Sequence, residues 1–161
     1  MLSSILGTRL ARWPDELACA ASAAALAGHG ALADAFIELH GPLGAGKTTF
    51  VRHLLAALGV EGRVKSPTYT LMEPYRSDSG HGAFAIAHFD FYRFDDPREW
   101  EDAGFRDVFA EPGLKLVEWP ENAEAQLPRC DLRLWICPHA ATAARNLRIE
   151  ALSARGEELL A

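Results

Sequence analysis

The feature that most constrains the fold of this chain is a glycine-rich segment, Gly41 to Thr48, with the sequence GPLGAGKT. It matches the phosphate-binding pattern G-x-x-x-x-G-K-[ST] at every fixed position. A mostly apolar run at 34–40 precedes it and is typical of a buried strand. Residues 49–58 follow with apolar side chains at helical spacing, and Gly59 is a typical helix stop. A strand, a glycine-rich loop and a helix in this order predict a phosphate loop rather than a chance glycine turn.

The residue types of this loop suit a nucleotide. Glycines allow backbone conformations in which the loop N–H groups turn inward as an anion nest, and the following helix presents its positive end to the same point. Lys47 adds a cation for the β- and γ-phosphates, and Thr48 offers a hydroxyl to Mg²⁺. The nucleotide-binding residues expected here are Gly41, Leu43, Gly44, Ala45, Gly46, Lys47, Thr48 and Thr49.

Length and composition predict one domain spanning residues 1–161, because 49% hydrophobic and 24% charged residues are ordinary for a globular protein. We expect a cytoplasmic protein, since no apolar run is long enough to span a membrane and the N-terminus lacks a signal-peptide pattern. The three cysteines are expected to be buried thiols. A net charge of −6 matches a polyphosphate backbone poorly, so we expect any contact with nucleic acid to run through a partner.

The rest of the chain predicts an α/β domain of the P-loop NTPase type, with three layers and a mixed parallel and antiparallel sheet. Pro14, Asp15 and Glu16 are expected to open a helix that ends near Ala27. Two antiparallel pairs are expected, the first a hairpin. The expected strands besides the one before the loop are 8–13, 68–75, 83–92, 114–118, 130–137 and 146–152, and the expected shorter helices are 98–103, 105–109 and 157–161.

A phosphate loop needs an acid opposite it to hold or orient Mg²⁺ and its waters. Glu118 follows an apolar strand, where such an acid usually lies, and Asp90 ends another strand. Both would project from strand ends on the side where open α/β sheets bind ligands. The alternatives are a solvated strand-end acid for Glu118 and a turn or capping acid for Asp90.

Other candidates are weaker. His88 and Asp90 share a strand face, but a zinc site needs three or four ligands, so a packed or hydrogen-bonded histidine is favoured. Thr68 follows a loop where nucleotide switches carry a γ-phosphate sensor, and a plain strand-start residue fits the local pattern equally well. Trp119, beside Glu118, is expected either to report nucleotide binding or to pack in the core, and core packing is favoured for a large aromatic. The chain has no N-K-x-D element for guanine, which favours ATP, and no obvious arginine finger, which predicts slow unaided hydrolysis.

Several segments together resemble the TsaE (YjeE) family of bacterial ATPases, over about Pro14 to Leu152. These segments, in chain order, are 41–50 (GPLGAGKTTF), 66–71 (SPTYTL), 88–93 (HFDFYR), 101–109 (EDAGFRDVF) and 116–121 (LVEWPE). Pro42 departs from the aspartate that the family often has, which removes one N–H from the loop mouth.

The resemblance implies that the chain works with TsaB and TsaD, which attach threonylcarbamoyl to an adenosine beside the anticodon of certain tRNAs. It also implies ATP hydrolysis, with Thr48 and Glu118 on Mg²⁺, Asp90 needed for hydrolysis and Thr68 in a switch-like segment. The resemblance also implies that Glu16 and Arg145 lie near the nucleotide. The local sequence pattern alone predicts that both are surface residues. Two alternatives stay open: a small-molecule kinase of the nucleoside or nucleotide type, and a binding module that uses ATP only as a conformational ligand.

Overall fold

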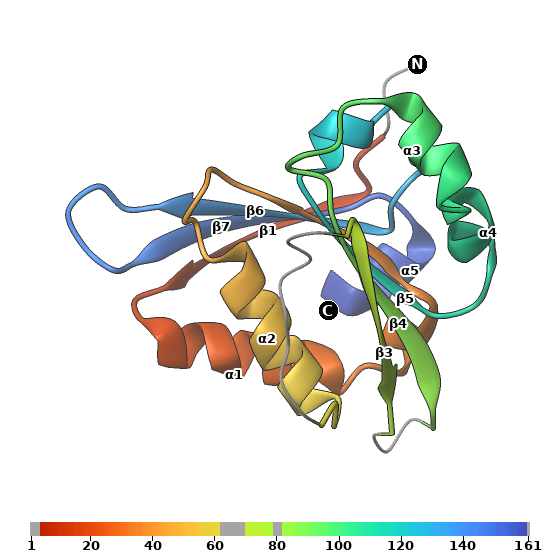
Figure 1. The fold of residues 1–161 in the computed structure, drawn as a ribbon. Helices are drawn as coiled ribbons and strands as arrows, with labels where there is room; N and C mark the ends of the chain where they lie inside the picture. The colour runs from red at the N-terminus through yellow and green to blue at the C-terminus, as the bar shows by residue number, and fades with distance from the viewer. Residues whose placement is uncertain (1–3, 62–69, 79–81, 161) are drawn as a thin grey trace.

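The computed structural model describes residues 4–61, 70–78 and 82–160. The helices and strands, in chain order, are β1 (Gly7–Trp13), α1 (Glu16–Ala27), η1 (Gly30–Asp34), β2 (Phe36–His40), α2 (Lys47–Ala57), β3 (Met72–Ser77), β4 (Phe84–Asp90), α3 (Pro97–Asp102), α4 (Phe105–Ala110), β5 (Leu114–Glu118), η2 (Pro120–Ala123), β6 (Leu132–Pro138), β7 (Arg145–Ala151) and α5 (Ala154–Leu160). The strands form one seven-stranded sheet in the order β1-β7-β6-β2-β5-β4-β3. The predicted α/β fold with a mixed sheet is confirmed (Figure 1).

Helices pack on both faces of this sheet, with α1, α2 and α5 on one face and α3 and α4 on the other (Figure 1). Strand alternation creates the two cores: Ile37 and Leu39 of β2 lie in the core under α1 and α2, and Phe36 lies in the core under α3 and α4. Helix α1 begins after Asp15, whose carboxylate accepts a hydrogen bond from the backbone N–H of Ala18 at 3.0 Å. The predicted capping acid is therefore confirmed.

The parallel part of the sheet positions the phosphate loop. Strands β6, β2, β5 and β4 run parallel to one another, so their carboxyl ends meet at one edge. Strand β2 lies inside this group and leads into the loop and α2. In the pairing of β4 with β5, Asp90 stands opposite Glu118, which places both candidate acids at the same edge. The antiparallel pairs β3–β4 and β6–β7 confirm the two predicted pairings.

Several strand boundaries differ from the prediction by one or more residues, and those of β3 and β4 have a clear physical cause. Strand β3 starts at Met72 and continues to Ser77, which pairs with Phe84 and donates its hydroxyl to the carbonyl of Leu58 at 2.7 Å. Strand β4 ends at Asp90 rather than at 92, because the Asp90 carboxylate accepts a hydrogen bond from the N–H of Tyr92 and turns the chain. Tertiary pairing and a side-chain turn, rather than β propensity, set these ends.

The cysteines are free thiols in the described part of the chain, and two of them are buried as expected. The expectation is wrong for Cys137, which is exposed. It lies on β6 and points away from the face that buries Leu134 and Ile136. None of the helices in residues 4–61, 70–78 and 82–160 has the length and hydropathy that a bilayer crossing needs.

Candidate nucleotide-binding site

The loop between β2 and α2 depends on its glycines. Gly41, Gly44 and Gly46 have φ values of 151°, 79° and 106°, a region that side chains disfavour. At Gly41 a Cβ would also lie 2.5 Å from the carbonyl oxygen of Ile136, so any larger residue would push the loop off β6. Gly46 directly precedes α2, whose amino-terminal end therefore meets the loop. The loop thus has the backbone that an anion nest requires.

The hydroxyl of Thr48 and the carboxylate of Glu118 lie in direct contact. Thr48 Oγ1 donates to Glu118, at 2.9 Å from Oε1 and 3.1 Å from Oε2. Thr48 stands in the first turn of α2, and Glu118 is the last residue of β5 and is buried. The structure therefore brings together the two residues that the sequence named as Mg²⁺ ligands.

These two residues form a donor set that fits Mg²⁺. Mg²⁺ prefers oxygen ligands and is usually bound by one or two protein groups, with substrate phosphates and waters filling the other positions. The described residues contain no cluster of three or more His, Cys, Asp or Glu that could hold a metal ion. A hydroxyl and a carboxylate beside a phosphate loop match the sparse protein coordination of a Mg²⁺–nucleotide complex.

Lys47 is buried beside the loop and beneath an aromatic ring. Its Nζ donates to the carbonyl of Gly41 at 2.6 Å and lies 3.5 Å from the centroid of the Trp119 ring. Burial lowers the pKa of Lys47 from its ordinary value, and the carboxylates of Glu118, Glu121 and Asp90 oppose that shift. The ammonium is thus held at the loop mouth by a carbonyl, a ring and nearby acids.

Trp119 makes a contact with Lys47 that the sequence pattern did not predict. Its ring is only partly buried and also packs on Tyr92, with centroids 4.9 Å apart. Its backbone has a φ of 55°, which is rare for a residue with a large side chain. The ring packs against the core beneath α3 and α4, as expected, and it also contacts Lys47. The sequence signal for this contact is the position of Trp119 directly after Glu118, the acid that ends β5.

Asp90 is a turn acid that also lies at the sheet edge beside the loop. One carboxylate oxygen accepts the N–H of Tyr92 at 2.9 Å, as a turn acid does. The residue also stands opposite Glu118 at the carboxyl edge of the sheet. Burial raises the pKa of Asp90 above its ordinary value, while the hydrogen bond from Tyr92 acts in the opposite direction. Thr68 lies outside the described residues.

A cavity of about 260 Å³ adjoins the loop and contains both residues that the resemblance added. Arg145, the first residue of β7, donates its Nε to the carbonyl of Ala45 at 2.7 Å. Glu16 also lines the cavity, and its carboxylate is 3.2 Å from His53 Nε2. The cavity is lined by Trp13, Asp15, Glu16, Cys19, Ala45, Gly46, Thr49, Ala143 and Arg145. Of these, Trp13 and Cys19 carry no sequence signal for a site, because only the fold places them here.

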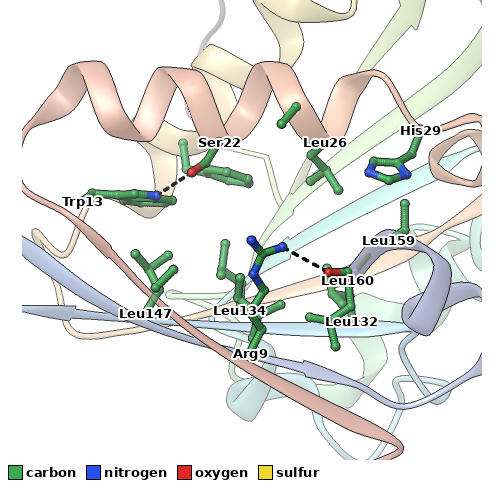
Figure 2. A pocket seen from close by; sticks show the side chains of 14 residues that line it. Arg9, Trp13, Ser22, Leu26, His29, Leu132, Leu134, Leu147, Leu159 and Leu160 are labelled. Atoms are coloured by element: carbon green, nitrogen blue, oxygen red, sulfur yellow. Dashed lines mark hydrogen bonds between the residues drawn. The ribbon is translucent and has the colours of Figure 1, made fainter.

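A second cavity, of about 210 Å³, lies between α1 and the strands β1, β6 and β7 (Figure 2). Three of its polar side chains contact each other or the backbone: Trp13 Nε1 donates to Ser22 at 2.8 Å, and Arg9 donates to the carbonyl of Leu160 at 3.2 Å. Its walls are otherwise largely leucine, alanine and aromatic side chains. The cavity is a packing gap beneath an alanine-rich helix, and the phosphate loop does not line it.

The family model described as "Threonylcarbamoyl adenosine biosynthesis protein TsaE" matches residues 13–147. The chain belongs to the TsaE family. It is 40% identical over 124 residues to the "tRNA threonylcarbamoyladenosine biosynthesis protein TsaE" of Haemophilus influenzae, an alignment that covers 77% of this chain and 75% of the relative. The TsaE protein of Bacillus subtilis is 37% identical over 123 residues, covering 76% and 73% of the two chains.

A solved structure agrees with this membership. The crystal structure of Bacillus subtilis YdiB superposes with a TM-score of 0.75 at 29% identity and covers 98% of this chain and 95% of that one. The TsaE fold thus includes the region from β1 to α5. The matched residues 13–147 contain the phosphate loop, both acids and Arg145.

Proposed function

We propose that this TsaE family member is a Mg²⁺-dependent ATPase that supports a TsaB–TsaD complex in the threonylcarbamoyladenosine modification of tRNA. The observation that carries the proposal is the contact between the Thr48 hydroxyl and the Glu118 carboxylate beside the glycine loop. The family membership supplies the pathway, since its relatives are named for tRNA threonylcarbamoyladenosine biosynthesis.

Each residue then has a definite task. The loop N–H groups and Lys47 bind the phosphates, and Thr48 and Glu118 would hold Mg²⁺. When bound, Mg²⁺ supplies positive charge against the phosphate oxygens. Asp90 orients the attacking water or accepts its proton as the bond from the γ-phosphorus to the bridging oxygen breaks, which yields ADP and phosphate. Glu16 and Arg145, which line the adjoining cavity, would flank the nucleoside end.

The site favours slow turnover by the chain alone. Arg145, the arginine that lines the adjoining cavity, is bonded through its Nε and Nη1 to the carbonyls of Ala45, Ala143 and Ala144. A guanidinium held by the backbone does not swing freely onto the γ-phosphate. Because an arginine finger is worth about 10³–10⁵-fold in rate in related enzymes, we expect TsaB and TsaD to raise turnover.

The experiment that tests the catalytic roles compares Glu118→Ala and Asp90→Ala with the unaltered chain. Phosphate release from ATP should fall by about 10²-fold or more in each variant, the range for loss of a catalytic acid or base. Binding of a fluorescent ADP should persist in part, because the loop amides and Lys47 remain. Unchanged turnover in both variants would refute these roles.

The same assay separates the two alternatives. A small-molecule kinase would transfer the γ-phosphate to a nucleoside or nucleotide, whereas an ATPase releases free phosphate. A non-hydrolytic binding module would show no cleavage in a single turnover even with TsaB and TsaD present. Pull-down of this chain against TsaB and TsaD, with and without ATP, tests the proposed partnership directly.

A further inference from the structure

A histidine outside the proposed ligand set lies against the magnesium-binding acid. His88 is in β4, its side chain is fully buried, and its Nε2 is 2.6 Å from Glu118 Oε2. Strand alternation explains this meeting: Ile86 and His88 of β4 and Leu116 and Glu118 of β5 face the α2 side of the sheet, and His88 pairs in register with Leu116. The histidine therefore reaches Glu118 diagonally from the neighbouring strand.

The surroundings of the imidazole define which nitrogen carries the proton. A carboxylate only accepts hydrogen bonds, so Nε2 must donate to Glu118. The other nitrogen, Nδ1, is buried and has no hydrogen-bond partner in residues 4–61, 70–78 and 82–160. The hydrogen bond from Nε2 to Glu118 is therefore the polar contact that the imidazole makes within these residues.

This bond restrains one oxygen of the Glu118 carboxylate. Thr48 contacts both oxygens of Glu118, and His88 contacts Oε2 alone. With only the Thr48 contact, the carboxylate could rotate about its last side-chain torsion. With His88 present, Oε2 is fixed, and therefore the direction of Oε1 is also set.

We propose that His88 is a positioning residue that holds the Glu118 carboxylate in the orientation needed to bind Mg²⁺ with the nucleotide. The inference rests on the proposed function. It follows the general rule that partners of ligating side chains orient them and that their loss typically lowers metal affinity or activity about 10–100-fold. A histidine that merely filled the core would affect stability and leave metal affinity unchanged.

The test measures Mn²⁺ binding to the ADP complex by electron paramagnetic resonance, with Mn²⁺ as the stand-in for Mg²⁺. His88→Phe keeps a ring but removes the donor, and we expect Mn²⁺ affinity to fall about 10–100-fold. His88→Gln places an amide N–H near the Nε2 position and should retain affinity within about threefold, because it restores the donor. Fluorescent ADP binding in EDTA should be the same in both variants.

The matched control is His40→Phe. His40 is also buried and bonded to a strand glutamate, Glu38, at 2.9 Å, but Phe36, which alternates onto the same face of β2, lies in the core away from α2. This control should keep wild-type Mn²⁺ affinity. An equal loss in His40→Phe, wild-type affinity in His88→Phe, or a loss in His88→Gln as large as in His88→Phe would each overturn the proposal.

A substitute variant and the unaltered chain separate the possible outcomes. If His88→Phe does not fold, His88→Asn replaces it, because its amide is too short to reach Glu118 and should show the same loss. If the unaltered chain itself binds no Mn²⁺ with ADP, the proposed function fails. If it binds Mn²⁺ and the His88 variants match it, only the positioning role fails.

Discussion

The Thr48 hydroxyl joins the first turn of α2 to the acid, since it donates to both oxygens of Glu118. Thr48→Val keeps the shape of the side chain but removes the hydroxyl. We expect ATP turnover to fall by about 10²-fold or more, as for the loss of a catalytic acid or base, because Mg²⁺ loses one proposed ligand and Glu118 loses a donor. Steady-state phosphate release is the measurement.

Thr48→Ser is the matched control for that substitution. Serine retains the hydroxyl at the same place on α2, so turnover should stay within about tenfold of the unaltered chain, a loss of no more than about 1.4 kcal/mol in activation free energy. If the valine variant hydrolysed ATP as fast as the serine variant, the hydroxyl would have no part in the reaction.

The three cysteines should differ in chemical reactivity. Burial, with the Glu16 carboxylate adding to it, raises the pKa of Cys19 to about 11, and burial raises the pKa of Cys130 to about 12. The reactive form is the thiolate, and a thiol with a pKa near 11 is ionised in only about one molecule in a thousand at pH 8. Iodoacetamide at pH 8 should therefore label the exposed Cys137 first.

Peptide mass spectrometry of the labelled chain checks this order. Denaturation in urea should expose all three thiols and make them label together. Labelling of Cys19 before Cys137 in the folded protein would show that the wall of the cavity beside the loop opens readily.

At the scale of elements, α1 leaves space that a larger side chain can fill. Nine of its 12 residues are alanine, cysteine or serine, and the cavity in Figure 2 lies between it and the sheet. Ala25→Leu adds apolar volume at the wall of this cavity and should stabilise the fold by about 0.5–1 kcal/mol. Thermal unfolding should shift upward by about 1–4 °C for a domain of this size.

The control for cavity filling is Ala24→Leu, at a neighbouring exposed position of α1 that does not line the cavity. Its unfolding temperature should change little, because a leucine there stays in solvent. Equal upward shifts in the two variants would show that filling the cavity is not the cause, and helix propensity cannot supply the gain because it favours alanine over leucine.

The elements also show what the sequence can predict. The strand, loop and helix from β2 to α2 follow from local pattern, because the glycine positions and apolar spacing are read within about 25 residues. The contacts that refine the site join distant segments: His88 with Glu118, Lys47 with Trp119, and Arg145 with the loop carbonyl of Ala45. Such long-range contacts depend on strand order and register, which the local sequence pattern does not specify.

The same limit explains the boundary errors. Strand β3 carries Pro74 in its middle, which a strand tolerates at the sheet edge where β3 lies, and it extends to Ser77 because that residue pairs with β4. Cys137 is exposed because of the strand face on which it falls. Whether a strand lies at the edge of the sheet, and which face of the sheet a residue occupies, are set only when the whole sheet has assembled.

At the scale of the whole molecule, the net charge of −6 opposes direct binding to tRNA. Nucleic-acid affinity depends chiefly on Lys and Arg side chains that replace counterions along the phosphate backbone, and even non-specific binders reach only about 10⁻⁴–10⁻⁶ M at physiological salt. We expect the chain alone to bind labelled tRNA more weakly than this range, with little change between 50 and 200 mM salt, concentrations that separate strong electrostatic binders by about 10³-fold or more. Fluorescence anisotropy of the labelled tRNA is the measurement, and TsaB with TsaD, added to the same tRNA, is the comparison. Micromolar binding by this chain alone, with a steep loss of affinity in salt, would mean that a local basic surface outweighs the net charge and that tRNA reaches this protein without a partner.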